Sequence, residues 1–583
     1  MQQRINMEGI LLEPLKYYES AGKTTHEQNV KAYFDDLLEK SGVDVVKNRA
    51  TVKKYKAEMA TAEKLRDRIF RKKFVRVLLV LAIIGCFIAA AIGVVKLSQK
   101  PRLGGLLLGF GLVLAVGGIL LVVKVLNPRI KQVSQLLEKH EKKAADLRVQ
   151  AEEQMAPLNA LFTDGDALRL IEKTLPQFEF DEGFSAENHN FFVRQFDLID
   201  EQSYYCSVTD TLSGRCFGNP FLYCDKIFHS LGTHVYHGAL TIYWTETYVD
   251  SEGNSRTRTV SQLLHASVVK PKPYYTQRKT LYYGNQAADE LSFSRIPQHS
   301  EELSEKERKR AVRRGAKKLA KKAAKATAKG GNFREMVNEE FDVLFGATDR
   351  DHEVQFRTLF TPLAQNNTVD LLTSQTGYGD DFYFTKRHRC NMITSEHAQS
   401  QSLDCSARNY YSFDVDVARR NFIKFNENYF KSLFFDFAPL MAVPAYQEEP
   451  VVSLEGLETY PSYYSFYEHE AMANQLGAAL VHRDARTTSI LKTKFLGKEN
   501  GRDRVEVTAY GYTTAERVDF VPRLGGDGKI HAVPVPWTEY IPVERTSQIL
   551  VGTKEESRGK TEEERKRFAQ DVLFHGLTAW ILE

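Results

Sequence analysis

Two long runs of apolar residues constrain this chain more than any other feature of its sequence. Residues 77–95 and 103–123 contain no charged or amide side chain, and only the seven residues 96–102 separate them. At about 1.5 Å per residue, helices over these runs would be about 28 and 32 Å long, which matches the roughly 30 Å of bilayer hydrocarbon. A soluble helix normally has a polar face, and neither run has one. The sequence therefore predicts a membrane protein with a two-helix transmembrane hairpin.

Glycines in the second run indicate close packing of this hairpin. Gly105 and Gly109 have the GxxxG spacing that lets helix backbones approach each other in lipid. The nearest surface for them is the first helix, and a second subunit is the alternative.

The distribution of basic residues predicts the orientation of the hairpin. Seven lie in residues 62–76, three in the connecting loop and six in the twenty residues after the second run. By the positive-inside rule, both ends of the chain are predicted to lie in the cytoplasm, in a multi-pass arrangement.

Helical patterns continue on both sides of the apolar runs. After the second run, apolar or small residues recur at alternating spacings of three and four, which is typical of a coiled-coil seam. His140 and Gln154 fall on the same seam. We therefore expect residues 43–161 to form a coiled-coil stalk that contains the transmembrane helices. The seam permits pairing within one chain or in a homo-oligomer. Residues 1–42 are predicted to form a tail and a helix that starts at a capping box of Thr25 and Gln28.

Beyond the stalk, the pattern predicts cytoplasmic domains rich in strands. Alternation over residues 240–248, a turn at 250–254 and a Val- and Thr-rich run to Val269 indicate a β-hairpin. We expect a β-rich domain over 162–300, a basic helical linker over 301–331 and an α+β domain over 332–560. Within the last of these, 341–345 is predicted to be a strand, 415–434 a helix, and 504–512 and 531–543 strands. A C-terminal helix is predicted over 561–583 from a second capping box, Thr561 with Glu564.

The linker is strongly basic. Residues 304–329 hold eight Lys and four Arg against two Glu, with Val312 and Leu319 as the only large apolar side chains. We expect a helix that does not pack as a core helix and that lies on anionic lipid headgroups. A solvated linker and a nucleic-acid-binding segment are the alternatives. The predicted contacts with the anionic surface are Arg308, Lys309, Arg310, Arg313, Arg314, Lys317, Lys318, Lys321, Lys322 and Lys325.

Three clusters contain side chains of the kinds found in metal or catalytic sites, but none has the spacing and partner residues that would assign it as a site. Asp380 and Asp381 follow a glycine, as in metal-binding turns, but this is also ordinary turn chemistry. His229, His234 and His237 are close in sequence, yet residues 234 and 237 of a strand point to opposite faces. Cys390 lies beside basic residues and His388, without a partner base. We therefore predict no catalytic residue, metal site or cofactor, and reduced cysteines throughout.

One part of the chain resembles a known group of proteins. The stretches 338–345, 348–349 and 356–364 are similar to an uncharacterised family of bacterial membrane proteins with an N-terminal transmembrane hairpin. The resemblance implies a bacterial inner membrane. Together these features favour a membrane-anchored scaffold or interaction protein at the cytoplasmic face, with unknown protein partners. The alternatives are a membrane-bound enzyme whose site is not visible in the sequence and a membrane tether for nucleic acid.

Overall fold

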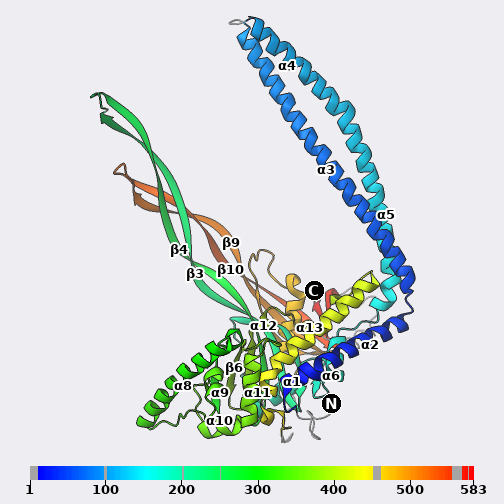
Figure 1. The fold of residues 1–583 in the computed structure, drawn as a ribbon, viewed down its shortest axis with the longest axis vertical. Coiled ribbons are helices and arrows are strands. Elements are labelled where there is room, and N and C mark those ends of the chain that lie inside the picture. The colour runs from blue at the N-terminus through cyan, green and yellow to red at the C-terminus, as the bar shows by residue number, and fades with distance from the viewer. Residues whose placement is uncertain are drawn as a thin grey trace. The chain divides into compact units, whose positions relative to one another are not determined.

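The computed structural model describes residues 11–97, 101–199, 203–249, 251–450, 461–553, 568–574 and 577–582. Contacts between residues divide the chain into two compact units (Figure 1). The helical unit comprises Lys31–Thr163 and Ala407–Phe425, and the body comprises Met1–Val30, Asp164–Ser406 and Asn426–Glu583. Each unit is described by itself.

Two very long helical segments form the helical unit. Helix α3 (Val45–Lys96) begins at Asp44, whose side chain accepts a hydrogen bond from the backbone N of Lys47. The chain returns through α4 (Pro101–Leu121), a short π-helix η2 (Val122–Leu126) and α5 (Asn127–Asn159). Both apolar runs lie in these helices, which are long and apolar enough to cross a membrane. Only 11% of each apolar window is buried, so these are not core helices of a soluble fold.

Glycines bring α3 and α4 into close contact, but they are not the predicted ones. A Cβ atom on Gly111 would lie 2.8 Å from the carbonyl oxygen of Cys86, and one on Gly104 would lie 2.8 Å from backbone atoms of Leu97. Gly118 likewise faces α3, so the contacting glycines of α4 recur every seven residues. Gly105 and Gly109 have no atom within 4 Å of such a Cβ, so the predicted contact of this GxxxG pair with the first helix is wrong. A seven-residue repeat keeps one face toward a neighbouring helix, whereas these two glycines lie on another face.

Helices α3 and α5 pack antiparallel within the chain. Thr51 accepts a hydrogen bond from Gln154 at 3.1 Å, and further along Arg66 forms an ion pair with Glu141 at 2.6 Å. His140 pairs with Glu58, so both polar residues of the predicted seam have partners on α3. The buried side chains between the helices are Val52, Ala62, Leu65, Ile69, Ile130, Ala144, Ala151, Met155 and Leu158.

The body contains a seven-stranded antiparallel sheet in the order β1-β2-β3-β4-β7-β6-β5. Its central strands β3 and β4 are paired along their whole length, from Phe221 opposite Tyr283 to Val249 opposite Ser255. The strands are β1 (Phe178–Phe180), β2 (Cys206–Cys216), β3 (Asn219–Val249), β4 (Ser255–Gly284), β5 (Ser292–Arg295), β6 (Phe382–Arg387) and β7 (Cys390–Ser395).

A second, five-stranded sheet has the order β11-β12-β10-β9-β8. Its strands are β8 (Ile490–Glu499), β9 (Arg502–Leu524), β10 (Ile530–Thr553), β11 (Phe568–Phe574) and β12 (Leu577–Leu582). The predicted strands near 504–512 and 531–543 are confirmed as parts of the β9–β10 hairpin. The predicted C-terminal helix is wrong over residues 577–582, because this apolar segment pairs with the edge of β10. Its predicted capping box at Thr561 and Glu564 lies outside the described residues.

Helix α14 (Phe466–Leu476) joins the two sheets through their cores. Its Tyr467 and Ala471 pack against residues of the first sheet, including Leu222 and Cys224. Met472, Ala473 and Leu476 pack against the five-stranded sheet. The helix is buried on nearly all sides, so it lacks the polar face of a surface helix.

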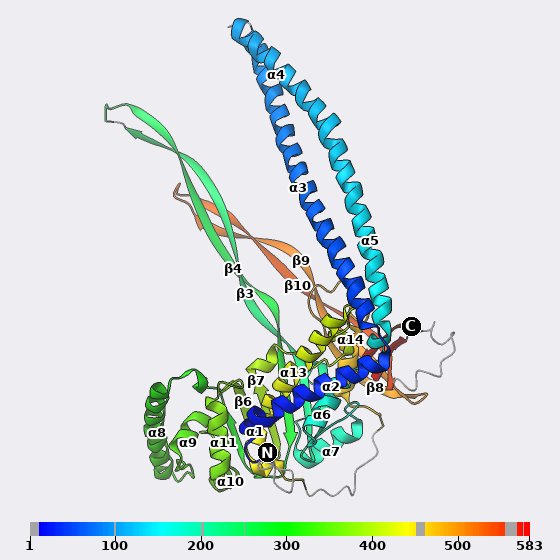
Figure 2. The ribbon, with the colours of Figure 1, turned by 45° about the vertical axis from the view of Figure 1, so that its right-hand side comes forward.

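The two long hairpins project from the sheets and lie side by side, as Figures 1 and 2 show. Ile242, Leu264 and Ala266 of β3–β4 pack against Val533 and Val535 of β10. We call this pair of hairpins the arm. The predicted hairpin over 240–269 is confirmed, but it is part of a much longer ribbon.

The predicted boundary between domains 162–300 and 332–560 is wrong. Strand β7 pairs with β4, with Tyr283 opposite Asn391, so one sheet contains parts of both predicted domains. Residues 341–345 form a helix rather than the predicted strand, because Asn338 caps the segment and Gly346 ends it in the left-handed region. The remaining helices are α1 (Pro14–Tyr17), η1 (Tyr18–Gly22), α2 (Lys23–Ser41), α6 (Asp166–Thr174), α7 (Ala186–Phe196), η3 (Ser300–Glu302), α8 (Glu305–Ala328), α9 (Glu339–Phe345), α10 (Glu353–Leu359), α11 (Pro362–Thr373), α12 (Glu396–Gln399), η4 (Ala407–Asn409), α13 (Val415–Met441), η5 (Pro444–Gln447) and η6 (Gly477–Ala479).

The packing of α3 on α4 predicts a difference between two neighbouring glycines. Gly111→Val should destabilise the hairpin by about 1–3 kcal/mol, because the new side chain meets backbone atoms of α3. Gly109→Val, where a Cβ meets nothing within 4 Å, is the matched control. Thermal unfolding in detergent, followed by helical circular dichroism, should show a lower midpoint for the first variant only. Equal midpoints would contradict this packing.

Candidate functional site

The basic segment predicted from sequence forms α8, a single regular helix. Ser304 accepts a hydrogen bond from the backbone N of Glu307, and the Glu307 side chain accepts one from the backbone N of Ser304, so the helix starts with a capping box. It ends before Gly330, which has a φ of +73°. Basic residues along the helix toward its C-terminus are favoured by the helix dipole.

One side of α8 packs on the body through two buried residues, although α8 is not a core helix, as the sequence predicts. Leu319 and Ala323 are buried against Phe333 and partly buried Val343 of α9. Gly315 permits the close approach, since a Cβ at this position would lie 2.4 Å from a methyl carbon of Val343. Small residues therefore form the packing face of α8, whereas an ordinary amphipathic helix packs through large apolar residues.

The support beneath α8 is itself held by a buried ion-pair network. Arg350 is fully buried and donates to Asp342 at 2.7 Å and to Glu353 at 2.8 Å. Its guanidinium also lies over the rings of Phe333 and Phe356, each 4.5 Å away. These contacts link Phe333, against which α8 packs, to the buried network of Arg350.

The other side of α8 carries most of the predicted contacts. Arg310, Arg314, Lys317, Lys321 and Lys325 recur at spacings of three and four, which places them on one face. With Arg313 and Lys318 they make seven exposed basic residues, which we call the basic face. Three predicted contacts are engaged elsewhere: Arg308 pairs with Glu340, Lys309 pairs with Glu305, and Lys322 donates to the carbonyl of Thr348.

The basic face can bind anions by diffuse attraction. Residues 310–325 extend over about 23 Å of helix, which is long enough to contact several phosphate groups at once. All seven members are Lys or Arg, and five of them lie in a straight row rather than in a pocket, so the geometry provides charge without a shaped recess for one ligand.

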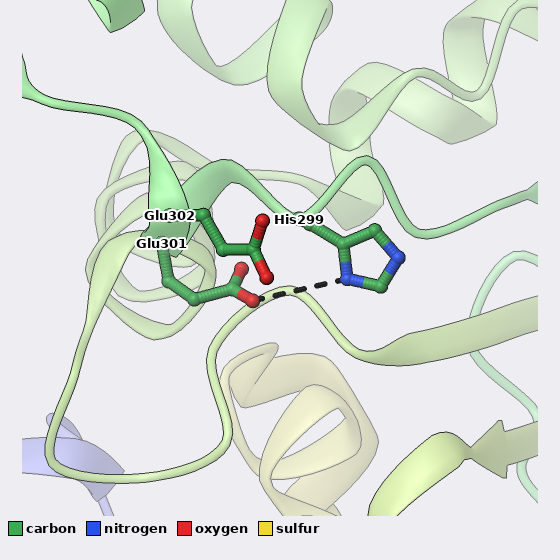
Figure 3. Close-up of side chains that lie close together, drawn as sticks. All are labelled: His299, Glu301 and Glu302. Atoms are coloured by element: carbon green, nitrogen blue, oxygen red, sulfur yellow. Dashed lines mark ion pairs between the residues drawn. The ribbon is translucent and has the colours of Figure 1, made fainter.

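A trio that sequence reasoning missed lies just before α8. His299, Glu301 and Glu302 have ligand atoms within 4.8 Å of one another, the geometry of a metal-holding group (Figure 3). The imidazole of His299 forms an ion pair with Glu301 at 3.8 Å. Glu301 also accepts a hydrogen bond from the backbone N of Asp380, so it stabilises the fold in any case. The short spacing of these residues was the signal available in the sequence.

The two aspartates of the Gly-Asp-Asp turn have separate structural roles. Asp380 is buried and pairs with the equally buried Arg295, and it accepts a hydrogen bond from Ser300 at 2.8 Å. Asp381 instead contacts His397 at 2.6 Å. Burial is the largest single influence on the pKa of His397 and lowers it, but the hydrogen bond to Asp381 and the negative charges of Asp436 and Asp381 together raise the pKa above its usual value. The two carboxylates therefore serve different partners rather than a shared metal ion.

The three neighbouring histidines are not brought together as a metal site. Only His229 reaches a hollow, of about 410 Å³, at the root of the arm, where its Nε2 lies 3.3 Å from the hydroxyl of Tyr512. His237 is exposed. The hollow is lined by Tyr204, His229, Tyr275, Ile490, Tyr510, Gly511, Tyr512, Pro542, Val543 and Glu544.

The thiol of Cys390 is not activated. Burial raises its pKa to about 12 despite the neighbouring Lys386. Burial also lowers the pKa of Lys386 to about 7, so this neighbour is a weaker source of positive charge at neutral pH than an exposed lysine. A nucleophilic cysteine instead needs a lowered thiol pKa and a charged basic neighbour.

Glu468 of α14 is a buried carboxyl group of the body with a strongly perturbed pKa. Burial raises its pKa to about 7, although hydrogen bonds from the backbone N of Phe184 and from Thr211 act in the opposite direction. Such a group would suit acid–base chemistry, but Glu468 is 1% exposed and does not line the hollow at the root of the arm. Its position indicates a structural role.

The raised pKa of Glu468 predicts a pH-dependent effect of Glu468→Gln. The folded state holds the proton more tightly than the unfolded state, so the stability contributed by this group is complete below pH 4.5 and is lost as the pH rises to about 7. The variant should therefore be more stable than the parent at pH 8, by up to about 3 kcal/mol, and similar to it at pH 4.5. Thermal shift measurements at both pH values test this, with exposed Glu544→Gln as the control. A pH-independent difference would contradict it.

Comparison of the chain with models of protein families, with curated proteins and with solved structures finds no match.

Proposed function

We propose that the protein is a membrane-anchored scaffold or interaction protein at the cytoplasmic face of a bacterial inner membrane. In this proposal α3 and α4 cross the bilayer as a hairpin, and α3 and α5 continue as a coiled-coil stalk. The body then presents surfaces to partner proteins. The sequence resemblance to bacterial membrane proteins with a similar hairpin supports the setting.

The observation that carries the proposal is the uncovered apolar surface of α3 and α4. Phe74, Leu81, Ile88, Phe110 and Val113 are each between 45% and 71% exposed. In water, large side chains exposed along two whole helices would be strongly unfavourable, whereas lipid tails cover them at no such cost. The close glycine contacts between the helices are also typical of packing in lipid.

The basic face of α8 supports a second contact with the membrane. Each basic residue near an anionic leaflet contributes roughly 1 kcal/mol, so seven contribute on the order of 7 kcal/mol at most. Lipid headgroups suit this row better than base recognition does, because residues 304–329 hold eight Lys and four Arg, and Lys attracts anions as a point charge rather than through a bidentate fork. The partners in this proposal are anionic lipid headgroups and unidentified proteins, with nucleic acid as the alternative.

An enzymatic role has less support from the described residues. The perturbed groups Glu468, Lys386 and Cys390 are buried, and the hollow at the root of the arm contains one histidine and one carboxylate. An active site normally places several convergent polar groups in a deep pocket. Exposed surfaces, rather than a pocket, are the prominent features of this body.

The proposed orientation predicts which residues a membrane-impermeant thiol reagent can reach. A cysteine at Ser98, in the loop between the apolar runs, should react in intact cells, whereas one at Ser251, at the end of the arm, should react only after lysis. The reason is the distribution of seven, three and six basic residues around the runs. The reverse pattern of labelling would overturn the orientation.

The proposed role of the basic face predicts loss of vesicle binding after charge reversal. Arg314→Glu with Lys317→Glu and Lys321→Glu should reduce binding of the purified full chain in detergent to immobilised anionic lipid by at least tenfold. The matched control is Arg314→Lys with Lys317→Arg and Lys321→Arg, which keeps the charge and should bind as the parent does.

Two further measurements distinguish anionic lipid from nucleic acid as the partner of the basic face. Neutral lipid should bind neither variant nor parent, and competing DNA should displace the parent only weakly. Unchanged binding after charge reversal would refute the role of α8. Displacement by DNA at low concentration would favour the nucleic-acid tether instead.

A further inference from the structure

The arm has an outer face without a single charged residue. Along β3 the odd-numbered residues 231–249 point away from the β9–β10 hairpin, and along β4 the odd-numbered residues 255–271 do the same. All nineteen are exposed, and none is Asp, Glu, Lys or Arg. With 26% charged residues in the chain, about five would be expected in nineteen positions. We call this surface the uncharged face.

The same two strands do carry charges, but on the opposite face. Glu246, Arg258 and Lys270 are even-numbered residues of that face. Glu246 pairs with Arg258 across the hairpin at 2.9 Å, and Lys270 pairs with Asp519 of β9 at 2.7 Å while its ammonium lies over the ring of Trp537. Charge on the ribbon therefore lies on the same side as the apolar residues that pack against the other hairpin, and it is absent from the side that faces outward.

An exposed sheet face without charged residues can be covered by another surface at a low free-energy cost of desolvation. Charged side chains on outward faces normally keep exposed strands soluble and unpaired. Here the uncharged face consists of Thr, Ser, His, Ala, Pro and exposed Leu, Val and Tyr, so covering it leaves no ion unsolvated. Leu231, Tyr243, Val249, Leu263 and Val269 on this face are each between 53% and 70% exposed.

We propose that the uncharged face is a homodimer interface, in which it packs against the same face of a second copy of this chain. Two uncharged faces can pack together without burying an unpaired charge. A surface that pairs with the same surface of a second copy forms a closed twofold contact, which is the commonest arrangement of soluble oligomers. Nineteen alternating positions on two strands span about 65 Å by 10 Å, or roughly 650 Å² in projection, close to the roughly 800 Å² per partner of a stable interface.

A lipid surface fits this face less well than a second copy does. Interfacial segments place Lys, Arg, Trp and Tyr beside their apolar residues to contact headgroups. The uncharged face has one Tyr, no Trp and no Lys or Arg among its nineteen residues. The proposal is independent of the basic face of α8, and it adds an interface separate from the stalk.

Cross-linking of the full chain in native membranes tests the contact directly. Thr241→Cys lies near the middle of the uncharged face, so it should form a dimer with a short bismaleimide whichever way the two copies run. The native cysteines of the body are buried, which keeps the background low. Glu516→Cys, exposed on the outer face of β9, is the control and should not form a dimer.

A charge pair then tests whether this face holds the dimer together. Thr241→Lys with Leu263→Glu places opposite charges directly across the hairpin, which is compatible with strand pairing, yet brings ions into the interface. Light scattering in detergent should show a dimer dissociation constant at least tenfold higher than that of the parent. Thr538→Lys, opposite Glu516 on the other hairpin, is the matched control and should leave the dimer unchanged.

Three outcomes would overturn the proposal. A monomeric parent chain at tens of micromolar with no cross-link at Thr241→Cys would exclude the dimer. A dimer that tolerates the charge pair would place the contact elsewhere, for example in the stalk. Loss of vesicle binding by the charge-pair variant without a change in oligomeric state would assign the face to lipid. Circular dichroism and binding through the basic face should remain as in the parent, which shows that the variant is folded.

Discussion

The arrangement of this protein depends on where its apolar surface can be covered. In the body, two sheets cover their apolar faces with α14, so that one helix contributes to both cores. In the helical unit, α3 and α4 cover only a narrow seam on each other, where glycines bring the backbones together. The remaining surface of the two apolar runs is left uncovered by the described part of the chain. The two units thus differ, because the body buries its apolar surface by folding inward and the helical unit leaves most of its apolar surface exposed.

The parts that follow from periodicity could be predicted from the sequence. The apolar runs and the helix over the basic residues depend on neighbouring residues, and their positions agree with the structure to within a few residues. The packing of α8 was missed because its contacts use Gly315 and alanines, which hydrophobic patterns ignore. The strand at 577–582 was missed because its apolar residues suit a helix as well as a strand, and pairing with β10 decides between them.

Long-range pairing explains the remaining errors. Strand β7 is separated from β4 by more than one hundred residues, so no local signal shows that they share a sheet. The candidate site shows the same limit. The positions of the basic residues were visible in the sequence, but the structure was needed to separate the seven that face outward from Arg308, Lys309 and Lys322, which contact protein groups. The one-sided distribution of charge on the arm likewise becomes meaningful only when the side covered by β9 and β10 is known.

The continuity of the arm with the core sheet has a mechanical consequence. Strand β3 is paired with β2 up to Phe228 and then continues to Val249 without interruption, paired only with β4. The part of β3–β4 that projects beyond β2 is therefore about 70 Å long, and its strands continue directly from the core sheet with no linker between them. The length of the paired strands sets the greatest distance from the core sheet at which the end of this ribbon can make a contact. A sideways force at its end would act as a torque on the same sheet that packs against α14, which links a distant contact to the centre of the body.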